Sequence, residues 1–359
     1  MYNQILSVAS VLETAGYILC AILVLLVMIT VHELGHYISG KIFGFGINEF
    51  AIGFGPKLFN KTKSNGEVFS VRALPLGGFC SFKGEDEEDD DPSAFNNKRP
   101  WQRIIVLISG AFMNYLLAVI LICIMFGCYG KPAYYVSGVA DGVIVSESTL
   151  NQNDVILSID GKNTYVATDI MKALKGKTAG QEVTVSVLRN GKPISLKITL
   201  HTTAEFDNVE QVVKVLEPLG LKSLTPTNVK VGFFSCIGSS FDYSIKVAGT
   251  IFTVLGELLT GKLALTSVGG TVTTVGMTAT AIKTGGMYNL LMIASYIGVN
   301  LAVFNLLPIP ALDGSRVVFT AIEWIRRKPI SRKVEAIIHF VGLIVLFGFA
   351  ILVDVLQLI

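Results

Sequence analysis

The sequence has 359 residues, of which 51% are hydrophobic and only 16% are charged, and its mean hydropathy is +0.60. This composition is too apolar for an ordinary soluble protein of this length and indicates an integral membrane protein. The formal net charge of +2 is the difference between 29 basic and 27 acidic residues, so the charge does not favour nucleic acid as a partner.

Four long stretches contain no Asp, Glu, Lys or Arg, and each is long enough to cross about 30 Å of hydrocarbon. They cover residues 14–31, 104–130, 284–312 and 336–353. The first stretch does not resemble a cleavable signal peptide, because no Lys or Arg precedes Lys41. The sequence therefore predicts four transmembrane helices.

The motif HELGH directly follows the first apolar stretch, at residues 32–36. Histidines four residues apart share one face of a helix, so His32 and His36 can bind one zinc ion, and Glu33 between them can take a proton from water. Ionisable groups at membrane depth are costly without a partner, and a divalent cation would supply one. We therefore expect Zn²⁺ held by His32 and His36, with Glu33 as the catalytic residue.

Two segments of the following loop also have distinct patterns. Residues 67–79 alternate in character and contain turn glycines, which predicts a β-hairpin with an edge that can pair with an extended substrate. Seven consecutive acidic residues at 85–91 lack the ligand spacing of a calcium loop, and we expect a solvated, mobile segment. The five cysteines show no CxxC spacing and are expected to be small buried hydrophobic residues.

Between the second and third stretches the chain changes to short alternating strands and turns. Residues 131–205 are expected to form a mixed α/β domain, with a helix at 167–175 and a hairpin turn at Asn190-Gly191. Residues 153–161 resemble the PDZ pattern Gly-Asp-x-Ile-x-x-Ile-Asn-Gly, with Asn153 in place of the first glycine. A PDZ-like domain would bind a peptide C-terminus, or would only block access of bulky substrates to the membrane site.

Residues 206–286 are apolar but are interrupted by charged residues, which makes a membrane span unlikely to form there. Amphipathic helices lying at the membrane surface fit this pattern better, with an irregular Gly- and Thr-rich connection over residues 266–280. The remaining segment, 287–359, holds the last two transmembrane helices.

The segment NLLPIPALDG, residues 305–314, offers the third metal ligand that a catalytic zinc requires. Its two prolines break regular helix, and such backbone survives at membrane depth only where protein or water satisfies it. Asp313 is the best candidate for the third ligand. The amide of Asn305, and one turn earlier that of Asn300, could bind a substrate carbonyl or could instead serve helix packing.

Basic residues are concentrated in the first loop and in the loop at residues 326–333, which places both loops in the cytoplasm. Both termini and the PDZ-like domain would then lie outside, with the active site near the cytoplasmic side. The expected location is the cytoplasmic (inner) membrane of a bacterium.

Together, HELGH on the first span and the NxxPxPxLDG pattern on a later span resemble the site-2 protease family of intramembrane zinc metalloproteases. Gly110 with Asn114 on the second span and the turn at residues 76–79 are further points of resemblance. The resemblance implies zinc bound by His32, His36 and Asp313, and a membrane-associated hairpin that contacts substrate, for which the candidate residues are Leu76, Gly77 and Gly78. It also implies regulated cleavage of single-span membrane proteins, such as anti-sigma factors or remnant signal peptides, after their outer domain has been shed.

The predicted fold is thus an α-helical membrane protein with four spans, an inserted PDZ-like domain and a β-hairpin. Residues 1–130 would hold the first two helices, the HELGH motif and the hairpin loop. Three alternatives remain: a catalytically silent PDZ scaffold, a transporter that uses Asp313 and Asn305 as a polar site, and a zinc protease whose third ligand is a glutamate, of which Glu323 is the nearest.

Overall fold

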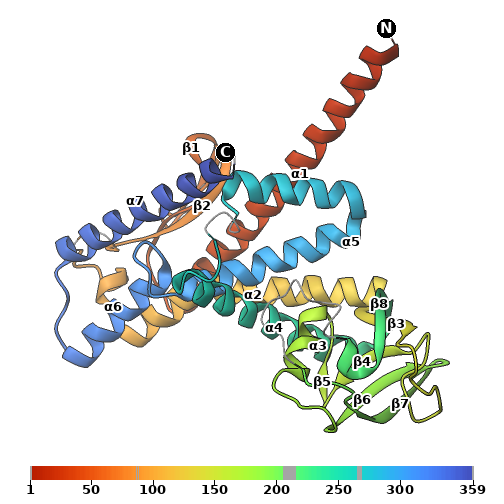
Figure 1. The fold of residues 1–359 in the computed structure, drawn as a ribbon. Coiled ribbons are helices and arrows are strands. Elements are labelled where there is room, and N and C mark those ends of the chain that lie inside the picture. Colours follow the sequence, from red (N-terminus) through yellow and green to blue (C-terminus); the bar gives the residue numbers. More distant parts are fainter. Residues whose placement is uncertain (1, 86, 88, 205–215, 265–268, 358–359) are drawn as a thin grey trace. The chain divides into compact units, whose positions relative to one another are not determined.

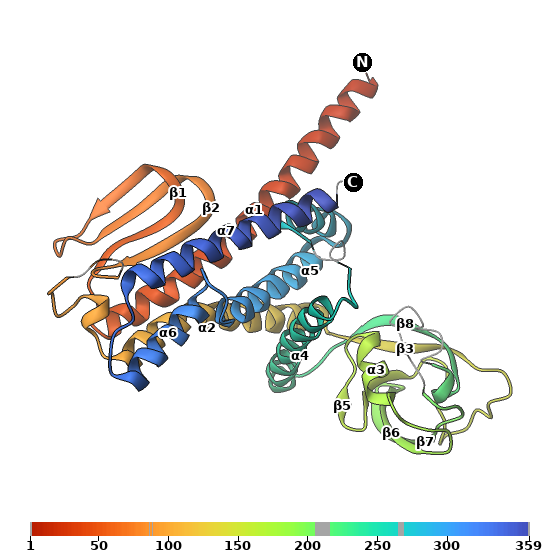
Figure 2. The same cartoon turned by 60° about the vertical axis from the view of Figure 1, so that its left-hand side comes forward.

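The computed structural model describes residues 2–85, 87, 89–204, 216–264 and 269–357, except for the side chains of 2–10, 76, 271 and 332. These residues divide into two compact units (Figures 1 and 2). One unit combines residues 1–122 with 244–359, and the other comprises residues 123–243. The two motifs identified above both lie in the first unit.

Long apolar helices form most of the first unit: α1 (Tyr2–Ile42), α2 (Pro100–Tyr129), α5 (Thr271–Leu306) and α7 (Arg332–Leu356). In the described part of the chain, four helical stretches are long and apolar enough to cross a membrane, namely Val11–Ile42, Pro100–Tyr129, Val272–Leu306 and Lys333–Leu356. Many of their large apolar side chains are exposed, as expected for surfaces that face lipid rather than water. The prediction of four transmembrane helices is confirmed at this level.

Among the cysteines, Cys236 is buried but Cys20 and Cys128 are exposed on these helices, so the expectation of uniformly buried thiols is wrong.

Helix α5 is broken at Gly286, which has φ +55°. Figure 1 shows that the chain reverses direction at this break, and the side chain of Asn289 donates a hydrogen bond to the carbonyl of Ala281, 3.0 Å away. Residues 271–285 are therefore helical, and the irregular connection expected over 266–280 is wrong for its described part. The helix ends at Leu306, just before Pro308 and Pro310, so the break that these prolines predicted is present.

The hairpin lies beside α1 and consists of β1 (Ile47–Thr62) and β2 (Val68–Phe82), paired antiparallel (Figure 2). Its two arms are β1 and β2, whereas the sequence suggested a hairpin within residues 67–79 alone. Residues 49–52 have partners in β2 on both sides, at 78–81 and at 68–71. This doubling is possible because Gly53 and Gly55 adopt positive φ, which lets β1 bend back on itself.

Apolar clusters attach the hairpin and α5 to the first two helices. Phe45, Phe82 and Phe95 pack with Val106 and Leu107 of α2, next to the short 3-10 helix η1 (Phe95–Asn97). Met28 of α1 packs with Ala294 and Ile297 of α5. Helix α1, which carries HELGH, is therefore packed against the cluster of the hairpin and α2 and also against α5.

The acidic run is partly tied to the structure, contrary to the expected solvated loop. Glu85 forms an ion pair with Arg316 on α6 (Asp313–Arg326), and Asp91 forms one with Lys83 at 2.6 Å. Asp86 and Glu88 lie outside the described residues. Long-range pairing with Arg316 could not be anticipated from a run of like charges.

The second unit is built on an antiparallel sheet with strand order β7-β6-β4-β3-β8, and β5 pairs with β4. The Asn190-Gly191 hairpin turn is present between β6 and β7, with both residues at positive φ, and the expected helix is α3. The core of this unit contains Val136, Ile156 and Leu174. The elements are β3 (Lys131–Val139), β4 (Val155–Ile159), β5 (Lys162–Asn163), α3 (Ala167–Leu174), β6 (Glu182–Arg189), β7 (Lys192–Thr199), η3 (Glu217–Leu219) and β8 (Leu221–Val229).

The predicted end of the domain at residue 205 is wrong. Strand β8 pairs with β3, although the sequence analysis assigned the residues of β8 to surface helices. The sheet therefore extends to Val229, well beyond residue 205. Helix α4 (Phe233–Leu259) follows, and it is not among the four apolar stretches that could span a membrane in the described residues.

Candidate metal centre

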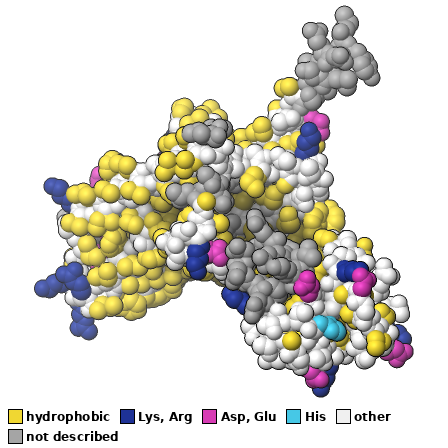
Figure 3. Space-filling model, in the orientation of Figure 1, with side chains coloured by type: hydrophobic (Ala, Val, Ile, Leu, Met, Phe, Trp, Pro, Cys, Tyr) yellow, Lys and Arg dark blue, Asp and Glu magenta, His cyan; other side chains and the backbone are white. Residues whose placement is uncertain are grey.

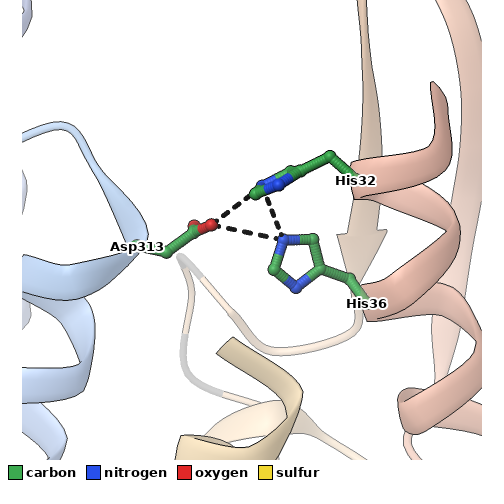
Figure 4. A group of neighbouring side chains, drawn as sticks. All are labelled: His32, His36 and Asp313. Atoms are coloured by element: carbon green, nitrogen blue, oxygen red, sulfur yellow. Dashed lines mark hydrogen bonds and ion pairs between the residues drawn. The ribbon is translucent and has the colours of Figure 1, made fainter. Parts of the chain in front are cut away.

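Three side chains that the sequence singled out come together in the first unit (Figure 4). Nε2 of His32 lies 2.9 Å from Oδ2 of Asp313 and 3.1 Å from Nε2 of His36. The distance from Nε2 of His36 to the same Asp313 oxygen is 3.3 Å. Three donor atoms from two distant segments therefore converge on one point.

Local structure explains this convergence. His32 and His36 are one helical turn apart on α1, so their rings project from the same face. Asp313 is the first residue of α6 and follows the irregular segment 307–312, in which the non-glycine Ala311 has φ +77°. The break that the two prolines impose thus turns the carboxylate toward α1.

The three donors fit a zinc ion. Zinc bonds of about 2.0–2.1 Å in a tetrahedral arrangement place ligand atoms about 3.3 Å apart, close to the separations found here. Nδ1 of His36 lies 2.8 Å from the carbonyl oxygen of Val106; donating its hydrogen there leaves Nε2 free as a ligand. Oδ2 of Asp313 faces Nε2 of both histidines, at 2.9 Å and 3.3 Å, so the carboxylate is placed as the third ligand.

Gly110 of α2 explains how the rings are held so closely. A Cβ atom at this position would lie 2.4 Å from Nε2 of His36 and 2.8 Å from Cε1 of His32. At Gly35 on α1, a Cβ would meet the carbonyl oxygen of Ser109 at 2.3 Å. The two helices therefore approach each other backbone to backbone beside the metal ligands.

Glu33 lies next to the ligands, in a cavity of about 300 Å³ that it lines together with His32, Asp313, Asn114 and Asn305. The two histidines are buried, each 7% exposed, whereas the side chain of Asp313 is 23% exposed. A cavity of this size admits water and an extended segment of peptide backbone at the ligands. The arrangement can hold a metal, a water molecule and a carboxylate base in mutual reach.

Two carboxamides flank His32 on the side away from Asp313. The amide nitrogens of Asn114 and Asn305 each lie 3.4 Å from Nδ1 of His32. When Nε2 binds a metal, Nδ1 carries the hydrogen and needs an acceptor. Oδ1 of the fully buried Asn114 has no hydrogen-bond partner within the described residues, and rotation of this amide would present that oxygen to Nδ1.

Asn114 is the residue that reasoning from sequence did not place in the site, although the GxxxN spacing with Gly110 was a signal for it. Asn305 is at the site as predicted from its position near the helix break. Asn300, by contrast, is not among the residues that line the cavity.

Of the substrate-contact candidates on β2, Gly78 lies near Glu33. A Cβ atom on Gly78 would lie 3.6 Å from Cγ of Glu33, and the backbone N–H of Cys80 interacts with the Glu33 carboxylate. Gly77 has φ +124° and packs so closely on the ring of Phe54 that any side chain would collide with it. The side chain of Leu76 lies outside the described part of the structure.

Glu323 is engaged elsewhere, so the alternative of a glutamate as third ligand is wrong. Its carboxylate is buried and accepts a hydrogen bond from Arg103 at 2.7 Å and another from the backbone N–H of Ile330 at 3.0 Å. The metal-binding group found among the described residues contains His32, His36 and Asp313 instead.

Comparison with known proteins found one matching family and several proteins with similar sequences. The model of peptidase family M50 matches residues 20–349. A Clostridium perfringens protein named "Putative zinc metalloprotease" is 34% identical over 96% of this chain and 98% of its own length. The "Regulator of sigma-W protease RasP" of Bacillus subtilis is 29% identical over 87% of this chain and 90% of its own. The "Zinc metalloprotease RasP" of Bacillus licheniformis is 28% identical over 90% of this chain and 94% of its own.

The matched region contains both HELGH and Asp313, together with the second and third apolar stretches and most of the first and fourth. A resident Zn²⁺, a protease activity and a membrane location follow from this relationship and agree with the geometry of the centre. The chain belongs to peptidase family M50, the site-2 protease family of membrane-embedded zinc metalloproteases.

Proposed function

We propose that this protein cuts single-span membrane proteins at a zinc centre formed by His32, His36 and Asp313, with Glu33 as the acid and base. The observation that carries the proposal is the convergence of the three donor atoms, within 3.3 Å of one another, on a cavity that Glu33 also lines. The central expectation is that the protein does not cut its substrate when Glu33 is replaced or when zinc is removed.

Zinc held by these ligands would supply Lewis acidity toward the scissile carbonyl and toward a water molecule in the cavity. Glu33 would take the proton from that water as it attacks, and would then deliver the proton to the leaving amine nitrogen. Asn305, which lines the same cavity, would hold the substrate backbone through its carboxamide. The reaction needs no covalent bond between protein and substrate.

A transmembrane helix hides its carbonyls in its own hydrogen-bond ladder, so the substrate has to be extended before it is cut. Residues 78–80 of β2 are a suitable template, because they lie beside Glu33 and pair with β1 on one side. A substrate strand added along β2 would bring its backbone next to the catalytic carboxylate. Leu76 and Gly77 belong to the same stretch.

The substrate class we propose is a membrane protein whose outer domain has already been removed, such as an anti-sigma factor or a remnant signal peptide. The name of the Bacillus subtilis relative, a regulator of sigma-W protease, supports the first of these. The protein would reside in the cytoplasmic membrane of a bacterium, with its termini and the sheet unit outside and the metal centre near the cytoplasmic side.

The sheet unit would act as a PDZ-like domain that binds a newly exposed peptide C-terminus or excludes substrates that still carry a bulky outer domain. In support, Asn153 has φ +71°, the left-handed conformation that suits the glycine of the PDZ pattern at this position. Next to it, Asp154 is buried and accepts hydrogen bonds from Arg189 at 2.6 and 2.8 Å, which fixes the turn into β4.

The test is cleavage of a tagged single-span substrate in liposomes by wild type, Glu33→Gln and Glu13→Gln. We expect Glu33→Gln to be about 10²–10⁴-fold slower, since general acid–base catalysis contributes that much. Glu13 is exposed on the same helix, so its variant is the matched control. A chelator should stop the wild type and added zinc should restore it.

Wild-type rates from Glu33→Gln would contradict the mechanism and favour a silent peptide-binding scaffold. Retained cleavage after complete removal of zinc would exclude the metal centre as the site of reaction. A transporter that uses Asp313 as a polar site would move a solute but leave the tagged substrate intact in every sample.

A further inference from the structure

A second cavity, of about 400 Å³, lies between the beginning of α2 and the end of α6. It does not include any metal ligand. Its lining contains four cations, Lys98, Arg103, Arg327 and Lys328, and one acid, Glu323, so its formal charge is +3. Such an excess of positive charge in one cavity is a binding site for an anion.

Arg103 makes this cavity more than a group of surface cations. It is only 5% exposed and its guanidinium is anchored by Glu323 at 2.7 Å. Because Arg103 also lines the cavity, its fixed positive charge would attract an anion there.

The first turn of α2 adds to the attraction. Pro100 is the first residue of this 30-residue helix and lines the cavity, so the positive end of the helix dipole lies at the site. The site therefore offers an anion both positively charged side chains and the N-terminus of a long helix.

The position of the cavity selects the source of the anion. The helical stretches that are long and apolar enough to cross a membrane begin at Pro100 and Lys333, so the flanking residues 96–99 and 323–329 would lie near the lipid head groups. Figure 3 shows Lys and Arg side chains gathered where α6 turns into α7, beside a broad hydrophobic surface. Trp324 lines the cavity and is half exposed, and the adjoining Ile325 is 83% exposed, which suits contact with acyl chains.

We infer that this cavity binds one anionic glycerophospholipid, with its phosphate at Arg103, Lys98 and the α2 N-terminus and its acyl chains along α6 and α7. The exposed cations Arg327 and Lys328 form the rim and would close over the head group. Basic pockets at the ends of membrane helices recognise lipid head groups by the same physics.

The chain contains two tryptophans, so Trp101→Phe leaves Trp324 in the cavity wall as the single tryptophan. We would titrate this variant, in a neutral detergent, with phosphatidylglycerol that carries brominated acyl chains, and follow the quenching of the Trp324 emission. Brominated phosphatidylcholine with the same chains tests the need for net negative charge. Inorganic phosphate in millimolar excess tests whether a soluble anion can replace the lipid.

The variant Arg327→Gln/Lys328→Gln removes two rim charges without breaking the buried pair of Arg103 and Glu323. Arg326→Gln/Lys333→Gln removes two charges from the helix ends that flank this loop, outside the cavity lining, and is the matched control. We expect phosphatidylglycerol to bind wild type at least about tenfold more tightly than phosphatidylcholine, and only the rim variant to lose that preference.

Equal quenching by the two lipids in wild type would overturn the inference. An equal loss of the preference for phosphatidylglycerol in the two double variants would also overturn it, because it would indicate unspecific attraction to a basic surface. Displacement of the lipid by millimolar phosphate would assign the cavity to a soluble phosphate instead. Thermal unfolding temperatures that agree among the variants would show that binding, not folding, was changed.

Discussion

The backbone N–H of Ala311 donates a hydrogen bond to Nδ1 of His339 over 3.1 Å and so ties the loop before Asp313 to α7. Ala311 has φ +77°, a conformation that costs a non-glycine residue about 1–2 kcal/mol. The loop therefore needs an external contact to keep the carboxylate of Asp313 in place. His339 provides that contact although it is distant from the metal ligands in sequence.

Replacement of His339 by leucine removes the acceptor and should allow the loop to relax. We expect the affinity for zinc to fall about tenfold, at the lower end of the losses seen for residues that support metal ligands. Competition with a chromophoric chelator measures this affinity on the purified protein. His201→Leu, which alters the one histidine of the sheet unit, should bind zinc like wild type, and an equal loss in both variants would argue against a specific role of His339.

The affinity for zinc should depend on the carboxamides of Asn114 and Asn305, which lie beside His32, and should not depend on Asn300. Asn114→Leu and Asn305→Leu each remove a group 3.4 Å from Nδ1 of His32, and we expect a loss of about 10–100-fold in zinc affinity for at least the buried Asn114. Asn300→Leu, on the same helix as Asn305 but outside the cavity lining, should stay within about twofold of wild type. A larger effect at Asn300 than at Asn114 would show that the ring is oriented by something else.

Gly110→Ala should empty the metal centre without unfolding the helix. The new methyl group would lie 2.4 Å from Nε2 of His36, so the ring has to move away from the ligand position. Metal analysis by mass spectrometry should show substoichiometric zinc. Gly127→Ala on the same helix meets open space, and since alanine favours helix by about 1 kcal/mol, this control should keep its zinc and full stability.

Glu67 makes the stability of the hairpin region sensitive to acid. Burial raises its pKa, but hydrogen bonds from Lys41, Tyr37 and Lys63 outweigh burial and lower the pKa to about 2. A carboxylate whose pKa is depressed on folding stabilises the protein above its unfolded pKa, about 4.5, and loses this contribution as the pH falls toward 2. The full contribution is at most about 3 kcal/mol.

Thermal unfolding at a series of pH values between 7 and 3 tests this expectation. Wild type should lose stability below about pH 4.5, whereas Glu67→Gln should be less stable at neutral pH and show a flatter profile. Glu87→Gln, at an exposed position of the acidic run, should follow the wild-type curve. Parallel curves for wild type and Glu67→Gln would mean that other carboxylates dominate the acid response.

Much of the metal centre was predictable because its signals are local. The spacing of His32 and His36 places both rings on one face of a helix, and the prolines before Asp313 mark a break where a carboxylate can turn inward. The four apolar helices follow from hydropathy alone, and the Asn190-Gly191 turn follows from the positive φ that both residues tolerate.

Other features depend on distant pairings that leave no local signal. Strand β8 joins the sheet through β3, a partner about ninety residues earlier, and the pairing of Glu85 with Arg316 joins residues that are 231 positions apart. Asn114 reaches His32 only because Gly110 lets α2 approach α1 closely. The helix at residues 271–285 was missed because glycine and threonine are weak helix formers, and tertiary packing overrides that weakness.

The metal ligands come from opposite ends of the chain, since His32 and Asp313 are 281 residues apart. During synthesis, α1 enters the membrane with HELGH long before the ribosome has added the third ligand. A nascent or truncated chain can therefore hold at most the two histidines, and two ligands bind zinc far more weakly than three. The metal centre therefore cannot be completed until the segment that carries Asp313 has been made and has folded against α1.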